Sequence, residues 1–145
     1  GLITLTENRD MKVCTTCHRL VDRTTHVCPV VQRRKVMKQR RITQNEESTE
    51  RELTTQRWRK FRRKIILMDG GCCQRCLIKF GKLETQHLTI QHIQPRVYRP
   101  DLMYEPSNCV TLCQSCNSTL GLNGLDFPWS PKERENNPLF KDIIL

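Results

Sequence analysis

Two Cys-x2-Cys pairs constrain this chain more than any other feature of its sequence. Cys73 and Cys76 form one pair, and Cys113 and Cys116 form the other. Two such pairs that close on one ion are the usual way to build a four-thiolate zinc site. We therefore expect a zinc clip that joins two segments far apart in the chain.

The stretch around the second pair carries polar residues that a purely structural zinc site does not need. His92 lies in the string QHIQP, Asn108 follows it, and Asn117 comes directly after the last cysteine. Hydrolysis of a phosphodiester needs a base for water, a cation on the phosphate and support for the leaving oxygen. Histidine suits the base, because its reference pKa of about 6.5 lies near working pH, and amide oxygens suit Mg²⁺. This order of residues suggests a small metal-dependent nuclease rather than a bare zinc finger.

Length and composition limit the size of the core. The chain has 145 residues, 37% of them hydrophobic, with a mean hydropathy of -0.61. We expect one domain, or one small domain with an arm, in which bound metal does part of the folding. Nine cysteines also allow a disulfide framework. No apolar leader opens the chain and no apolar run suits a membrane span, so we favour zinc thiolates in a reducing cytosol and expect no membrane partner.

The positive charge is concentrated in the first half of the chain. Residues 1–64 hold 17 Lys/Arg and 7 Asp/Glu, whereas residues 65–145 hold 8 of each. Such asymmetry indicates a polyanion-binding arm on a neutral module, although a merely solvated helix surface is the alternative. Met11 is a cleaner start than Gly1, so we expect residues 1–10 to be disordered or non-native.

A second metal site is predicted within residues 11–30. Cys14, Cys17, His26 and Cys28 form a ligand set of three thiolates and one imidazole. His18 competes as a ligand, but it directly follows a cysteine, and adjacent ligands rarely both reach one tetrahedral ion. The alternative is a flexible tail with free thiols.

The next two segments differ in their periodicity. Residues 31–56 have no strong apolar period and predict a charged linker or a solvated helix. In residues 57–68, one helical stripe is apolar and consists of Trp58, Phe61, Ile65 and Met68. We interpret Trp58 and Phe61 as packing residues. The basic residues on the other faces are expected to bind DNA phosphates, and they are Arg57, Arg59, Lys60, Arg62, Arg63 and Lys64.

The remaining pattern predicts a strand ending near His92, a proline-containing loop, a short return strand at CVTLC and a short helix after it. Cys72 and Cys109 are interpreted as small buried residues. His87 is expected to be exposed, and to bind metal only if the strand bulges. Residues 131–145 are a predicted C-terminal tail. The aromatic residues from 122 onward are expected on the domain surface, and they are Phe127, Trp129 and Phe140.

The run from Gly71 to Gly124 resembles the HNH endonucleases of bacteriophages. The resemblance covers roughly residues 57–130 and implies a small α+β, ββα-metal (HNH) fold stapled by a four-cysteine zinc site, here preceded by a zinc knuckle and a basic helical arm. It implies that His92 is the general base, that Asn108 holds the loop and orients the base, and that Asn117 ligates the catalytic metal. The implied catalytic ion is Mg²⁺ or another divalent ion such as Mn²⁺ or Ni²⁺.

One position departs from the family pattern. Gln91 stands where the family usually has an Asp or His metal ligand, and its carbonyl oxygen adds no negative charge. We therefore expect a DNA endonuclease or nickase, phage-encoded, acting in the bacterial host cytoplasm, with a phage terminase or portal as a possible partner. One alternative is a zinc-clipped nucleic-acid-binding module whose nuclease site has decayed at Gln91. Another is a structural protein of the machinery that packages phage DNA.

Overall fold

The computed structural model describes residues 10–131 and residue 134. The predicted start, 1–10, and tail, 131–145, therefore lie almost entirely outside the described residues, as does Phe140. The chain divides into two compact units, Gly1–Thr43 and Gln44–Leu145. Helix α2 (Pro29–Glu52) contains the boundary between them.

The first unit contains a small antiparallel hairpin. Strand β1 (Met11–Val13) pairs with β2 (Leu20–Asp22) in the register Val13↔Leu20. The connection between them is a tight turn, in which the Cys14 amide donates to the Arg19 carbonyl at 2.8 Å. After β2, the Asp22 carboxylate accepts hydrogen bonds from the amide and the hydroxyl of Thr24. These turns are what bring the cysteines of residues 11–30 together.

Residues 31–56 were predicted to be either a charged linker or a solvated helix. The structure has a helix, α2, over most of this segment, and Thr49 is its one buried residue. A helix that is polar on all sides gains little from packing, which agrees with the missing apolar period. In the part of the chain that the structure describes, neither α2 nor any other helix has a stretch apolar enough and long enough to span a membrane.

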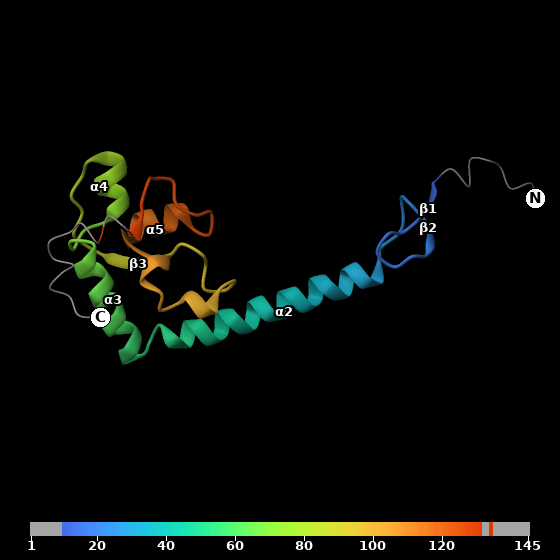
Figure 1. The fold of residues 1–145 in the computed structure, drawn as a ribbon, viewed down its shortest axis with the longest axis horizontal. Helices are drawn as coiled ribbons and strands as arrows, with labels where there is room; N and C mark the ends of the chain where they lie inside the picture. The colour runs from blue at the N-terminus through green and yellow to red at the C-terminus, as the bar shows by residue number, and fades with distance from the viewer. Residues whose placement is uncertain (1–9, 132–133, 135–145) are drawn as a thin grey trace, which may run out of the picture. The chain divides into compact units, whose positions relative to one another are not determined.

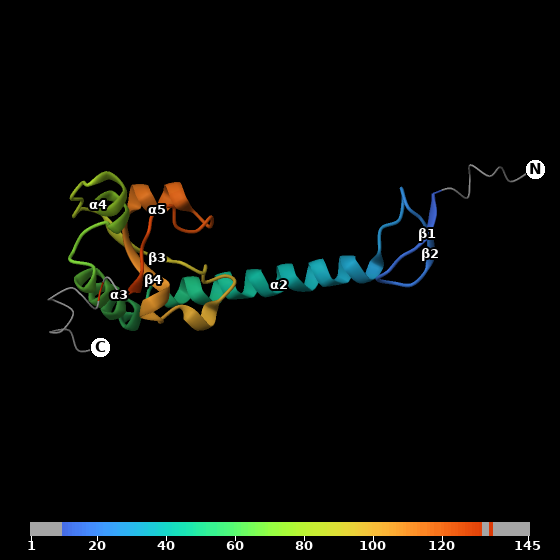
Figure 2. The same ribbon diagram turned by 45° about the horizontal axis from the view of Figure 1, so that its top comes forward.

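The second unit is built on a β-hairpin with helices on both faces. β3 (Leu88–His92) and β4 (Cys109–Cys113) pair antiparallel, from Leu88↔Cys113 to His92↔Cys109. Figures 1 and 2 show α3 on one side of this hairpin and α4 and α5 on the other. The other elements of this unit are α3 (Gln56–Met68), α4 (Gln74–Phe80), η1 (Pro100–Leu102), η2 (Pro106–Asn108) and α5 (Gln114–Leu120).

The alternation of side chains along β4 divides the core in two. Val110 and Leu112 pack with α4 and α5 in one hydrophobic cluster. Cys109 packs on the opposite face with Ile90 and the buried stripe of α3. Successive residues of a strand point to opposite faces, so one short strand supplies both clusters.

Helix α3 follows the predicted stripe. Trp58, Ile65 and Met68 are buried, and Phe61 packs beside them. The Thr55 side chain caps the first turn by accepting the Trp58 amide at 3.2 Å. Gly70, with φ of 75°, is the first of two left-handed glycines that end the helix.

The second unit begins earlier than the predicted domain start at residue 57. Side chains near the end of α2 bind the loop after β3: Asn45 donates to the Val97 carbonyl at 2.9 Å, and Arg96 donates to the Thr49 hydroxyl at 2.6 Å. The Tyr104 hydroxyl also donates to the Glu52 carboxylate. These contacts join residues far apart in the sequence, so local periodicity does not reveal them.

A buried ion pair joins Asp69, at the end of α3, to Arg134. Asp69 accepts from Arg134 at 2.7 Å and 3.0 Å, and the two side chains are 1% and 3% exposed. Asp69 also accepts the Thr111 amide at 2.8 Å, and the Arg134 guanidinium lies 4.7 Å from the centre of the Trp129 ring.

Phe127 is buried in the core. The expectation that these aromatic residues lie on the surface was therefore wrong for Phe127, because the chain folds back onto α5.

We predict that Arg134→Ala lowers the free energy of unfolding by about 3–5 kcal/mol, because it leaves the buried Asp69 carboxylate without its cation. Arg99→Ala is the matched control. It breaks an exposed pair with Asp101 and should cost less than about 1 kcal/mol. Denaturant titration followed by tryptophan fluorescence measures both, and equal losses would contradict a structural role for the buried pair.

Candidate functional site

The two Cys-x2-Cys pairs of the second unit adopt the same local structure. Cys73 caps the N-terminus of α4 and Cys113 caps that of α5, each in an extended conformation. Each sulfur accepts the amide of the second cysteine of its pair, and both N···S distances are 3.5 Å. The second cysteines, Cys76 and Cys116, therefore lie in the first turn of each helix and point back toward the first.

The four sulfurs of this cluster lie within 4.8 Å of one another, and all four residues are buried. Cys76 Sγ is 3.9 Å from Cys113 Sγ and 3.6 Å from Cys116 Sγ. A tetrahedral zinc with Zn–S bonds of about 2.3 Å needs sulfurs about 3.8 Å apart. The thiols are not joined as disulfides. The residues present therefore fit a zinc ion.

The first unit holds a second group with the predicted composition. Cys14, Cys17, His26 and Cys28 place their ligand atoms within 4.8 Å of one another. Backbone amides of Cys17 and Thr16 lower the pKa of the Cys14 thiol to about 6, which favours the thiolate that zinc binds. His18 lies outside this group and sits in a left-handed turn with φ of 60°.

His92 ends β3 on the face that carries α3. Its ring stacks on Trp58, with centroids 5.3 Å apart and planes at 30°. His92 Nε2 is 3.1 Å from the Met103 carbonyl oxygen. A carbonyl only accepts, so Nε2 carries the proton and Nδ1 keeps the lone pair. Burial lowers the pKa of His92, and the charge of Arg96 acts in the same direction.

Asn108 is buried beneath the loop that follows His92. Its side-chain oxygen accepts the Gln94 amide at 2.8 Å, and its nitrogen donates to the carbonyls of Gln94 and Leu102 at 3.2 and 3.3 Å. Its backbone carbonyl also accepts the Ile93 amide at 2.8 Å. The Asn108 side chain thus bonds only backbone groups in these three hydrogen bonds, so it positions the loop.

Gln91 faces the opposite side of the hairpin from His92. It is buried, and its amide nitrogen donates to the Gly121 carbonyl at 2.8 Å, at the end of α5. Asn117 lies on α5, half-buried, and its backbone carbonyl accepts the Gly121 amide at 3.0 Å. The structure therefore brings the two predicted metal ligands to one side of the hairpin. The histidine ring packs on the other side, against α3.

The sequence was also compared with known protein families and structures. The sequence profile of the HNH endonuclease family matches residues 73–121, from the first clip cysteine to the end of α5. The matched residues lie within the second unit and support an HNH-type nuclease there. This confirms the predicted resemblance, the small α+β fold and the enzyme class, a nuclease hydrolase.

A solved structure of an HNH endonuclease is also similar. It comes from the deep-sea thermophilic bacteriophage GVE2 and was determined with a manganese ion. The match has 20% identity and a TM-score of 0.49, and it covers 71% of this chain and 97% of that one. No curated protein matches the chain.

The donor atoms of the HNH domain suit a hard divalent ion only in part. The Gln91 nitrogen is engaged by Gly121, which leaves Oε1 as its ligand atom, and Asn117 offers a second amide oxygen. Among the described residues, the His, Cys, Asp and Glu side chains gather into metal-binding groups only at the two cysteine clusters. Two neutral amides fit an ion such as Mg²⁺ that keeps most of its waters and shares a substrate phosphate.

The six basic residues predicted to bind DNA are not equivalent in the structure. Arg62 turns inward and donates to the Leu88 carbonyl at 2.5 Å, so it ties α3 to β3. Arg57 lies over the Tyr104 ring, 3.9 Å from its centre. Arg59, Lys60 and Arg63 are exposed on α3, and Lys64 is half-buried. The helical stripe alone did not distinguish Arg62 from its neighbours.

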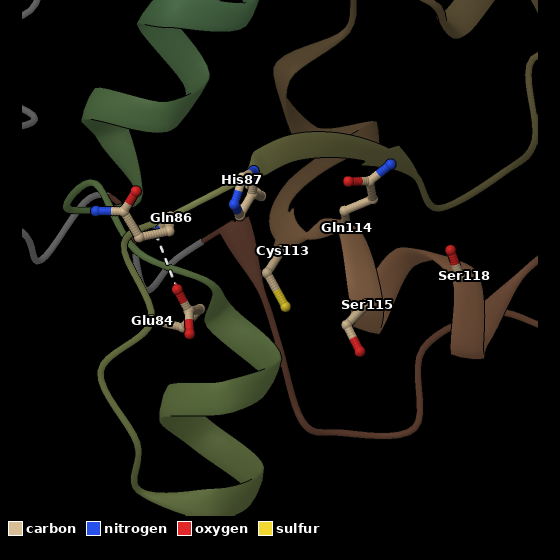
Figure 3. A pocket seen from close by; sticks show the side chains of 7 residues that line it. All are labelled: Glu84, Gln86, His87, Cys113, Gln114, Ser115 and Ser118. Atoms are coloured by element: carbon tan, nitrogen blue, oxygen red, sulfur yellow. Dashed lines mark hydrogen bonds between the residues drawn. The ribbon is translucent and has the colours of Figure 1, made fainter.

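A pocket of about 440 Å³ beside the clip contains His87 but not His92 (Figure 3). His87 is exposed, has a left-handed φ of 52° and belongs to neither cysteine cluster. Glu84 and Cys113 line the same pocket. Sequence reasoning missed the contacts that hold the His92 ring. Trp58 was interpreted as a packing residue only, and no sequence signal marks the Met103 carbonyl.

We predict that Cys113→Ser removes zinc from the second unit and unfolds it, because metal binding and folding are coupled in such a clip. Elemental analysis should find two zinc ions in the wild type, one for each cluster, and one in the variant. Cys72→Ser is the control, since Cys72 is also buried but lies outside the cluster. A Cys113→Ser protein with wild-type zinc content and melting temperature would contradict the clip.

Proposed function

We propose that this protein is a metal-dependent DNA endonuclease or nickase. The observation that carries the proposal is the state of His92: Nε2 is held by the Met103 carbonyl, and Nδ1 keeps a lone pair that can accept a proton. Its lowered pKa keeps the imidazole neutral at neutral pH, the form that a general base requires.

The reaction follows from the roles of the chain's own residues. His92 Nδ1 takes a proton from a water molecule whose oxygen bonds to phosphorus in line with the leaving oxygen. The P–O bond to the leaving oxygen breaks, and that oxygen takes a proton from solvent. Trp58 and the Met103 carbonyl fix the ring in the orientation for this transfer, and Asn108 holds the loop that contains Met103. Gln91 and Asn117 would hold a divalent ion, which would supply Lewis-acid stabilisation of charge on the phosphate and the leaving oxygen.

The nucleic-acid-binding module with a decayed nuclease site is the second candidate. It is favoured by the contact of Gln91 with the Gly121 carbonyl, which gives the glutamine a structural task at the end of α5. The retained His92, with its bound Nε2, favours catalysis instead. The two candidates differ in whether any divalent ion supports cleavage.

The basic first unit is proposed as the arm that binds the DNA backbone. Residues 1–43 hold 10 Lys/Arg and 3 Asp/Glu. We further propose that the protein is phage-encoded, acts in the bacterial host cytoplasm and works with the terminase or portal during DNA packaging. The third sequence-based alternative, a structural protein of that machine, would use the same arm for a protein partner.

We predict that His92→Ala lowers the rate of plasmid cleavage by at least the roughly 10²-fold typical of a lost general base. Zinc content and DNA affinity should stay unchanged, because neither cysteine cluster includes His92. His87→Ala is the matched control, as it removes an exposed imidazole from the same segment. A nicking assay with Mg²⁺, Mn²⁺ and Ni²⁺ measures both, and equal activity of the two variants would exclude His92 as the base.

We predict that Gln91→Asp raises cleavage at low Mg²⁺ concentration, because a carboxylate binds this ion more strongly than an amide does. The substitution also removes the bond to Gly121, so a small loss of thermal stability is expected. Rates are compared across a Mg²⁺ titration, with Gln94→Asp, an exposed position, as the charge control. If wild type and Gln91→Asp are both inactive with every ion, the binding-module candidate replaces the enzyme.

We predict that deleting residues 1–43 weakens DNA binding and flattens its salt dependence, because each lost phosphate contact lowers the slope by about one unit. The deletion ends at Thr43 because Asn45, Thr49 and Glu52 belong to the second unit and bind its loop after β3. Affinity for one duplex is measured at several salt concentrations. An unchanged slope would mean that the arm serves a protein partner.

A further inference from the structure

A pocket of about 390 Å³ lies between α3 and the loop before β4. Its lining combines three cations with two aromatic rings and a proline. The residues that line it are Arg57, Lys60, Phe61, Lys64, Tyr104 and Pro106. This volume falls in the range of pockets that hold a small organic ligand and exceeds what a lone phosphate needs.

Among the described residues, no ion pair engages the cations of this pocket. Among the described residues, the carboxylates that form ion pairs are Asp69, Asp101 and Asp126, and none of their partners lines the pocket. Glu52 accepts the Tyr104 hydroxyl, but it is not part of the lining. Lys60 and Lys64 are one helical turn apart and so point to the same side of α3. The pocket therefore attracts an anion.

Arg57 gives the pocket a flat surface as well as a charge. Its guanidinium lies over the Tyr104 ring at 3.9 Å, and the residue is exposed. Because Arg57 is exposed, its guanidinium remains accessible to a ligand in this position. Nucleic-acid bases stack on guanidinium planes and on aromatic rings, so Arg57 held in this way is a prepared platform for a base.

The pocket is connected to His92 through one shared side chain. The Trp58 ring lies 5.5 Å from Phe61 and 5.8 Å from Tyr104, and its stack with His92 has a 5.3 Å separation. A ligand against Phe61 and Tyr104 is thus separated from the general base by a single indole. A DNA strand that crosses His92 can place a neighbouring nucleotide there.

We propose that this pocket binds one unstacked nucleotide of the substrate strand. Lys60 and Lys64 hold its phosphate, and its base stacks on Arg57. In an intact duplex the bases are stacked and paired, so the pocket favours DNA with a single-stranded gap over continuous duplex. The inference rests on the proposed function only in that the chain binds DNA. It names the form of DNA that the site prefers.

The test compares affinities of the full-length chain for two fluorescent DNAs of equal length, one a continuous duplex and one with a short single-stranded gap. Binding is measured by anisotropy without added divalent ion. Wild type should bind the gapped DNA more tightly. Arg57→Ala should weaken gapped binding by about fivefold or more, the loss expected for one stacked base, and should change duplex binding far less.

Two further variants separate stacking from charge. Arg57→Lys keeps the charge but loses the plane, so it should also lose the preference for the gap. Arg63→Ala removes one exposed charge of α3 outside the pocket and should weaken both DNAs alike. Equal losses on both DNAs for Arg57→Ala and Arg63→Ala, or a wild type without preference, would overturn the inference. Plasmid cleavage by the same wild-type sample tests the proposed function separately.

Discussion

The second unit depends on a cluster of four cysteine sulfurs, those of Cys73, Cys76, Cys113 and Cys116. They supply half of the eight buried residues in the cluster that joins α4, β4 and α5. Helix α4 is only 7 residues long, too short to be stable without tertiary contacts. A zinc ion in the cluster would make up for this small core, because its bonds form only in the folded state. It would also hold the hairpin and α5 in place for the proposed catalytic groups.

Gln91 and His92 lie on opposite faces of the β3–β4 hairpin. Gln91 and His92 are neighbours in the chain, yet one meets the end of α5 and the other stacks on α3. The proposed metal ligands and the proposed base therefore approach a substrate from different sides of the strand end. This separation allows each to be held by its own partners, Gly121 for the glutamine and Met103 for the histidine. It also explains why α3 matters for more than packing.

Much of this arrangement was predictable from local patterns. The clip, the stripe of Trp58 and Ile65, and the strand that ends near His92 follow from ligand spacing and periodicity. The early start of the second unit and the burial of Phe127 were not predictable, because they depend on contacts over long sequence separations. The inward orientation of Arg62 was not predictable either, because the six basic residues of α3 look alike in the sequence.

The sequence by itself determined which chemical groups are available: two sets of zinc ligands, a histidine, three amides and a basic helix. Only the tertiary structure decided how each group is used. It placed a carbonyl against His92 Nε2, and this choice leaves Nδ1 as the basic atom. It also engaged the Gln91 nitrogen and laid Arg57 over Tyr104. Backbone carbonyls and ring faces carry no residue-specific signal, so their partners appear only when distant segments are packed together.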